Sequence, residues 1–140
     1  MQLVTFEAML VDRLNATGQV QARSFMAADF PALYGVLVQV DGATVPFRLT
    51  KGSGTGDPTM TDAERALHDA NIARLKGGAP PRMQYSPQQR RKAEDLIRDV
   101  LAVEPPPASV FVEGPVDGRD RPGVKVRFDT GAEIYVVPVV

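Results

Sequence analysis

The chain has 140 residues, of which 44% are apolar and 24% are charged, so it can form one soluble globular domain with a core of its own. Sixteen basic residues against seventeen acidic ones leave it nearly neutral, which argues against a strongly basic nucleic-acid binder but not against a local basic patch. The absence of cysteine excludes disulfides and thiolate metal sites, and a single histidine excludes a centre built from several histidines.

The first segment predicts a long strand over residues 2–12, because apolar side chains occupy every second position. These positions are Val4, Phe6, Ala8 and Leu10. Turn-forming residues follow at 15–18, and a second strand is expected over residues 19–26.

The clearest hairpin in the first half joins strands at residues 33–39 and 45–50 through Asp41-Gly42, a dipeptide suited to tight turns with positive φ. The earlier strand is apolar on both faces, which favours a central place in the sheet. Pro46 in the later strand cannot donate to a strand ladder, so we expect an edge strand or a bulge there.

Residues 51–58 form a glycine-rich loop that includes Lys51 and Gly54. Alternating glycines before a helix are able to wrap a phosphate. The phosphate-loop ending Gly-Lys-Ser/Thr is missing, however, and Asp57 stands where a dinucleotide-binding loop has its third glycine. We therefore interpret the loop chiefly as a flexible or partner-ordered segment.

Two helices follow the loop. The first begins at Thr61 with Glu64 in a capping-box arrangement, ends at Gly77-Gly78, and carries alanines at 63, 66, 70 and 73 that let another backbone approach closely. The second begins at Ser86-Pro87 and ends before the prolines at 105–107. Its apolar stripe consists of Ala93, Leu96, Ile97, Val100 and Leu101.

The segment from Arg74 to Lys92 contains six basic residues, no acidic residue and one tyrosine at its centre. On the simpler interpretation, the basic residues that begin the second helix pair with acidic residues four positions later on a solvated face. On the alternative one, the run contacts an acidic partner, either a neighbouring subunit or a nucleic-acid backbone. The predicted pairs are Arg90 with Glu94, Arg91 with Asp95, and Glu94 with Arg98.

The last third returns to strands at residues 109–113, 124–128 and 132–137, the last two forming a hairpin around Asp129-Thr130-Gly131. Lys125 and Arg127 point away from the apolar side of their strand, so they are able to share a solvated surface with Arg119 and Arg121. The chain ends on an apolar run that needs cover from a sheet or from another subunit.

The order of elements predicts a single α+β domain over residues 1–140, and no internal repeat is visible in the sequence. We expect about seven mostly antiparallel strands, in a sheet or a partly closed barrel, with a two-helix insertion between strands 4 and 5. The domain then divides into a β-rich half at 1–50, the glycine-rich loop and two helices at 51–104, and a second β-rich half at 108–140.

For function, the sequence predicts a non-catalytic structural or assembly protein that acts through protein-protein contacts. We expect a homo-oligomeric subunit of a larger particle, with a virion component as one setting, and a nucleic-acid-binding accessory protein as the alternative. The candidate interaction surface consists of Lys51, Gly54, Arg82, Tyr85, Arg90, Arg91 and Lys92.

No catalytic, metal-binding or cofactor-binding residue is predicted. His68 lies on a predicted helix, where a partly buried or solvated side chain is more common than a general base. No serine stands in a nucleophile elbow. The sequence also shows no signal peptide and no apolar run of membrane-spanning length, so we expect synthesis in the cytoplasm and no membrane partner.

Overall fold

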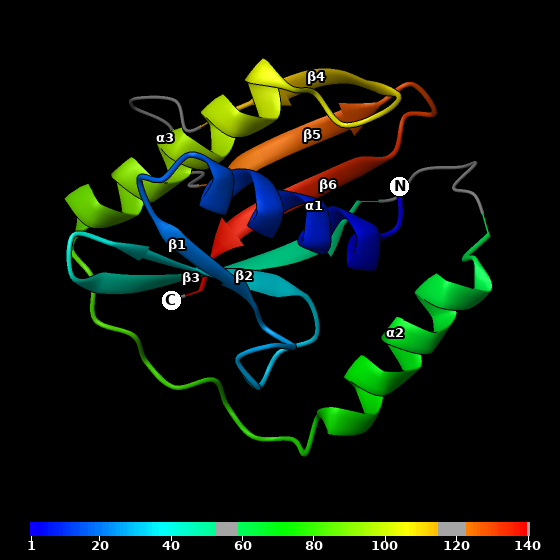
Figure 1. Cartoon of the computed structure of the whole chain (residues 1–140), viewed down its shortest axis with the longest axis horizontal. Helices are drawn as coiled ribbons and strands as arrows, with labels where there is room; N and C mark the ends of the chain where they lie inside the picture. Colours follow the sequence, from blue (N-terminus) through cyan, green and yellow to red (C-terminus); the bar gives the residue numbers. More distant parts are fainter. Residues whose placement is uncertain (53–58, 115–122, 140) are drawn as a thin grey trace.

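The computed structural model describes residues 1–52, 59–114 and 123–139. Within these ranges a six-stranded antiparallel sheet forms one layer, and two helices that cross the same face form the second (Figure 1). In chain order the elements are α1 (Leu3–Ala16), β1 (Gln21–Ser24), β2 (Gly35–Val40), β3 (Ala43–Lys51), α2 (Asp62–Arg74), α3 (Pro87–Val103), β4 (Ser109–Glu113), β5 (Val124–Phe128) and β6 (Glu133–Pro138).

The α+β class and the antiparallel pairing are confirmed, but the predicted first strand over residues 2–12 is wrong, because this segment forms α1. Phe6, Leu10 and Leu14 follow one another at four-residue spacing and are all fully buried, as one face of a helix requires. The described sheet therefore has six strands rather than seven, and the helical insertion follows the third strand rather than the fourth.

One continuous face of the sheet makes the core. Side chains at alternate positions of β2, β3, β5 and β6 are buried, and their strand pairing places them on the same side. Val36 lies opposite Phe47, for example, and Leu49 lies opposite Val136. Helices α1 and α3 cover this face with their apolar stripes, and together these residues form the hydrophobic core.

The predicted edge or bulge at Pro46 is wrong, because β3 is a central strand between β2 and β6. The carbonyl oxygen of Pro46 accepts a hydrogen bond from the amide of Val139, just beyond the last residue of β6. In an antiparallel pair, the N and C=O of one residue point toward the same neighbouring strand. The N of Pro46 therefore points in the direction of Val139 as well, at a place where β6 has already ended. Proline is tolerated in a central strand for this reason.

Apart from α2, the described elements form two halves with the same order of elements, although the sequence shows no visible repeat. The first half runs α1–β1–β2–β3 and the second α3–β4–β5–β6, while the strand order β1-β2-β3-β6-β5-β4 joins them at β3 and β6. Each helix also carries one buried glutamate: Glu7 accepts a hydrogen bond from the amide of Gly35 at 2.9 Å, and Glu94 from the amide of Gly123 at 3.0 Å. The two halves are thus related by an approximate two-fold axis between β3 and β6.

The predicted helix starts are confirmed, since both capping boxes are present. Thr61 and Glu64 exchange hydrogen bonds at the start of α2, and Ser86 and Gln89 do so at the start of α3. The two helices do not lie together as a hairpin: α3 packs on the sheet beside α1, whereas the irregular segment 75–86 leads away to α2 (Figure 1). None of the helices in the described ranges has both the length and the apolar character needed to span a membrane.

Gly35 provides a test of the packing where β2 begins. A Cβ atom at this position would overlap the Phe25 ring and the carbonyl oxygen of Phe47. We expect Gly35→Ala to lower the free energy of unfolding by about 1–3 kcal/mol, the usual cost of overpacking, as measured by urea denaturation. Gly114→Ala is the matched control, because an added Cβ there meets the side chain of Arg98, which is able to move aside. Equal losses in the two variants would contradict this account.

Candidate functional site

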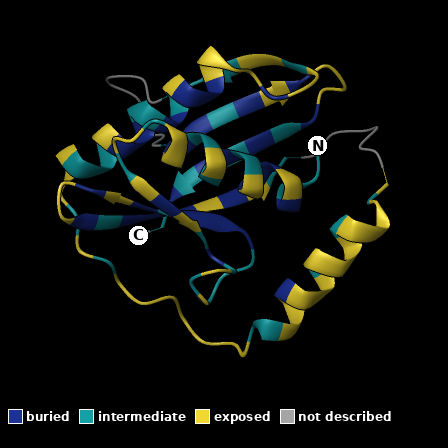
Figure 2. Cartoon of the chain, in the orientation of Figure 1, coloured by how far each residue is buried: buried dark blue, intermediate teal, exposed yellow. Residues whose placement is uncertain are grey.

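Helix α2 stands apart from the core of the molecule (Figure 2). Asn71 is its only buried residue, and the side chains of Leu67 and Ile72 are each 49% exposed. The alanines at 63, 66, 70 and 73 are exposed as well. A helix of this length is only marginally stable in water by itself, so its position depends on its caps and on the contacts that hold it to the body.

Polar side chains provide much of that attachment. Arg74 donates hydrogen bonds to the carbonyl oxygens of Phe30 at 2.6 Å and Ala32 at 2.7 Å, and Asn71 donates to the carbonyl oxygen of Leu33. The side chain of Asn71 also accepts a hydrogen bond from Arg74. These two residues therefore satisfy backbone carbonyls of the segment that leads into β2 and fix the C-terminal half of α2 to it.

Two further contacts hold the rest of α2. The Tyr34 hydroxyl shares a hydrogen bond with Nδ1 of His68, and the two rings stack with their centroids 5.8 Å apart. Near the N-terminal end of α2, the Thr5 hydroxyl on α1 donates to the carboxylate of Glu64. His68 is thus a structural partner of a buried tyrosine.

Glu7 of α1 is a buried acidic residue whose pKa is strongly raised. It is 5% exposed, and burial raises its pKa from 4.5 to about 7, although the Gly35 amide and the nearby Arg74 favour the charged form. Burial, with the neighbouring Glu7 carboxylate, also raises the pKa of Tyr34. The Glu7 carboxyl therefore titrates close to neutral pH under the attachment site of α2.

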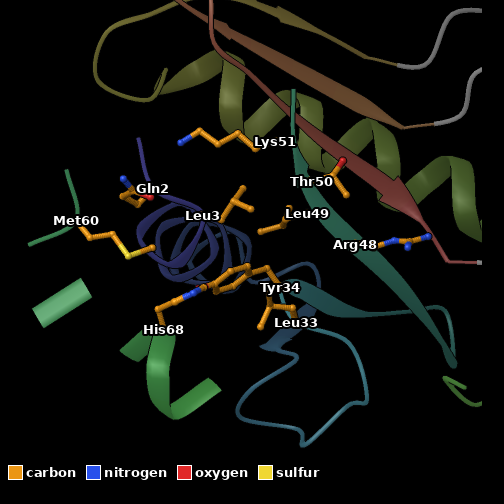
Figure 3. Close-up of a pocket in the computed structure, with 10 residues that line it drawn as sticks. All are labelled: Gln2, Leu3, Leu33, Tyr34, Arg48, Leu49, Thr50, Lys51, Met60 and His68. Carbon is orange, nitrogen blue, oxygen red and sulfur yellow. The ribbon is translucent and has the colours of Figure 1, made fainter. Parts of the chain in front are cut away.

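A cavity of about 440 Å³ lies between α2, the first turn of α1 and the end of β3 (Figure 3). His68 and Tyr34 point toward one another on one side of it, and the side chain of Arg48 extends away from them. The lining is largely apolar. It consists of Gln2, Leu3, Leu33, Tyr34, Arg48, Leu49, Thr50, Lys51, Met60 and His68. In the described part of the chain no three or more His, Asp or Glu side chains are placed to hold a metal ion.

The predicted interaction residues that the structure describes come from β3, from the segment 75–86 and from α3. Lys51 lines the cavity at the end of β3, and Gly54 lies outside the described residues, as do Arg119 and Arg121. Arg82 is exposed in the segment 75–86. Tyr85 is half-buried, and its hydroxyl donates to the carbonyl oxygen of Val139 at 2.8 Å, which fastens the end of the apolar C-terminal run within the same chain.

The basic residues at the start of α3 form ion pairs within the chain. Arg90 lies 3.0 Å from Glu94 and Arg91 lies 3.2 Å from Asp95, so these two predicted pairs are confirmed. The third predicted pair, Glu94 with Arg98, is wrong, because Arg98 pairs with Asp95 and Asp99. Lys92 lies 2.9 Å from Asp41 in the β2–β3 turn. On the last hairpin, Arg127 pairs with Glu133 and Lys125 with Glu113.

Sequence reasoning missed Asn71 and Arg74 as residues that attach α2, and it missed Glu7 as a buried carboxyl. A glutamate within an apolar helical stripe signals a buried carboxyl, but that signal is lost when the segment is interpreted as a strand. The carbonyls that Asn71 and Arg74 contact belong to residues about forty positions earlier in the chain, and no local pattern marks them.

Comparison of the chain with protein-family models, with curated proteins and with solved structures finds no match.

The raised pKa of Glu7 predicts a dependence of stability on pH. The native state holds the Glu7 proton more tightly than the unfolded chain does. The stabilisation of the folded state by Glu7 is therefore fully present below the unfolded pKa of 4.5 and is lost as the pH rises through about 7. Glu7→Gln keeps an acceptor for the Gly35 amide and should remove this loss, which amounts to at most about 3 kcal/mol. Urea denaturation across this pH range measures it.

The control for that experiment is Glu64→Gln. Hydrogen bonds, first from Thr5 and then from the Thr61 amide, lower the pKa of Glu64. The same chemical change there should leave the loss between pH 4.5 and 7 in place. An identical pH profile for the wild type and Glu7→Gln would show that Glu7 does not carry the effect.

Arg74→Ala tests the polar attachment of α2. It leaves the carbonyls of Phe30 and Ala32 without their charged donor, which should raise amide exchange in α2 roughly 10- to 100-fold and leave the sheet protected. Hydrogen-deuterium exchange read by mass spectrometry resolves the two regions. Arg65→Ala, at an exposed position of the same helix, serves as the control and should exchange like the wild type.

Proposed function

We propose that this chain is a non-catalytic assembly protein that binds other protein subunits, including copies of itself, through the outward face of α2. The observation that carries the proposal is a capped helix outside the core, attached by polar contacts, with large apolar side chains turned to solvent. A repeated subunit of a larger particle is the setting that suits such a helix, and a virion is one such particle.

The composition of the outward face supports a protein partner. Alanines recur along α2 at helical spacing, with Leu67 beside them, so another backbone is able to approach closely and Leu67 is able to fill a pocket in the partner. Apolar side chains gathered on one exposed face mark interaction surfaces more often than chance exposure. A partner helix or groove over this face would also give α2 the packing that it lacks within the chain.

The inward face of α2 supports a positioning role rather than chemistry. His68 has its Nδ1 engaged by the Tyr34 hydroxyl, so the histidine serves to hold the helix in this arrangement. Asn71 and Arg74 are likewise turned toward backbone carbonyls. Polar contacts of this kind fix the direction of a helix, which an assembly contact needs in order to be specific.

The nucleic-acid alternative gains no comparable support from the geometry. Arg90, Arg91 and Lys92 each pair with a carboxylate of the same chain, which leaves the segment without a row of cations directed at one groove or strand. Arg74, the first residue of the basic run, points into the molecule.

Leu67→Lys tests the proposed contact. Placing a charge where a leucine is buried against a partner should weaken association roughly 10- to 100-fold, since burial of such a side chain is worth about 1.5–3 kcal/mol. Light scattering across a concentration series measures this for the purified chain. Gln88→Lys adds the same charge at an exposed position of α3 and should associate like the wild type.

The proposal fails if Leu67→Lys and Gln88→Lys assemble alike. Circular dichroism of both variants shows whether the helices are intact, so that misfolding of one variant is not mistaken for a lost contact.

A further inference from the structure

The two edges of the sheet differ in how they are protected. An edge strand presents unpaired backbone groups to solvent, and proteins usually block them. At β1 the block is present: the side chain of Asn15 accepts from the amide of Ala22 at 2.7 Å and donates to its carbonyl at 3.0 Å, as a neighbouring strand would. The exposed residues of β1 are also polar, and they include Arg23.

Strand β4 forms the opposite edge, and in the described part of the chain no side chain caps the backbone of Val110, Phe111 or Val112 as Asn15 caps Ala22. Among the described elements only β5 pairs with it, and its sequence Ser-Val-Phe-Val-Glu holds neither proline nor lysine. The side chains of Val110 and Phe111 are 62% and 49% exposed. A bulge between Ser109 and Phe111 interrupts the pairing with β5 and leaves Val110 without a partner there.

We infer that β4 pairs with β4 of a second copy of this chain, antiparallel and centred on Phe111, so that two sheets join into one. This inference rests on the proposed assembly role and supplies one contact of that assembly. The strand is self-complementary in this register: Phe111 faces Phe111, Val110 faces Val112, and Ser109 faces Glu113.

The register also separates the charges. Glu113 is the only charged residue of β4, and antiparallel pairing places the two copies of it at opposite ends of the contact. Parallel pairing would set them side by side and is disfavoured. Phe111 pairs with Arg127 of β5, on the sheet face that the helices leave open, so two Phe111 rings are able to meet there without displacing either helix.

A single-cysteine variant tests this pairing directly, because the chain has no cysteine of its own. Directly opposed residues of an antiparallel pair have Cα atoms about 4.5–5.5 Å apart, within reach of a disulfide. Under mild oxidation we expect Phe111→Cys to give a covalent dimer as its main product on a non-reducing gel. Arg127→Cys is the control, since this exposed residue lies on β5, one strand further from the proposed contact between the two copies of β4. It should give only collisional cross-links.

Light scattering of Phe111→Lys and Leu67→Lys separates this inference from the proposed role of α2. We expect Phe111→Lys to lose the dimer and Leu67→Lys to keep it while losing larger assemblies. Equal cross-linking of the two cysteine variants, or a dimer that survives Phe111→Lys, overturns the pairing of β4. If Leu67→Lys has no effect while Phe111→Lys gives monomers, only the role of α2 fails.

Discussion

The constraint that shapes this molecule is a sheet with one apolar face that two helices are sufficient to cover. The stripes of α1 and α3 lie over the alternate buried residues of β2, β3, β5 and β6 and close the core. In the described part of the chain, α1 and α3 occupy that face and α2 does not share it. Helix α2 therefore lies outside the core, and the opposite sheet face carries side chains such as Arg48, Lys125 and Arg127, which are exposed or half-buried.

Each half of the two-fold arrangement contains one buried glutamate in an equivalent environment. Glu7 and Glu94 occupy equivalent places, each accepts a hydrogen bond from the glycine at or just before the start of the second strand of its half, and burial raises the pKa of both. The cation that favours the charged form of each glutamate comes from a different part of the chain. Arg90 reaches Glu94 from the same helix, whereas the charge that favours ionised Glu7 belongs to Arg74 of α2. The protonation of Glu7 and the position of α2 are therefore linked through one charge, and the second half has no such link through another helix.

The features that the sequence predicted correctly are those decided by neighbours in the chain. Both capping boxes, the Asp41-Gly42 turn and the alternation in β5 depend on residues only a few positions apart. The failures depend on distant partners. Residues 2–12 have apolar side chains at both helical and strand spacing, and only the sheet beneath them selects the helix. Pro46 is acceptable because β6, just over ninety positions later, ends opposite it. For the candidate site, the basic run and its pairs with Glu94 and Asp95 were visible in the sequence. The pairing of Lys92 with Asp41 and the exposure of Leu67 were not.

The locations of the two proposed contacts decide what kind of assembly they build together. Strand β4 lies at one edge of the sheet, and α2 projects from the opposite side of the molecule (Figure 1). Use of one surface therefore leaves the other accessible. Pairing of β4 with itself is isologous and closes at two copies, so by itself it ends growth. A second contact through α2, at a different place and direction, would join such dimers to further subunits. An extended sheet of two copies with a helix projecting at each end is thus a unit that repeats, which one contact alone does not provide.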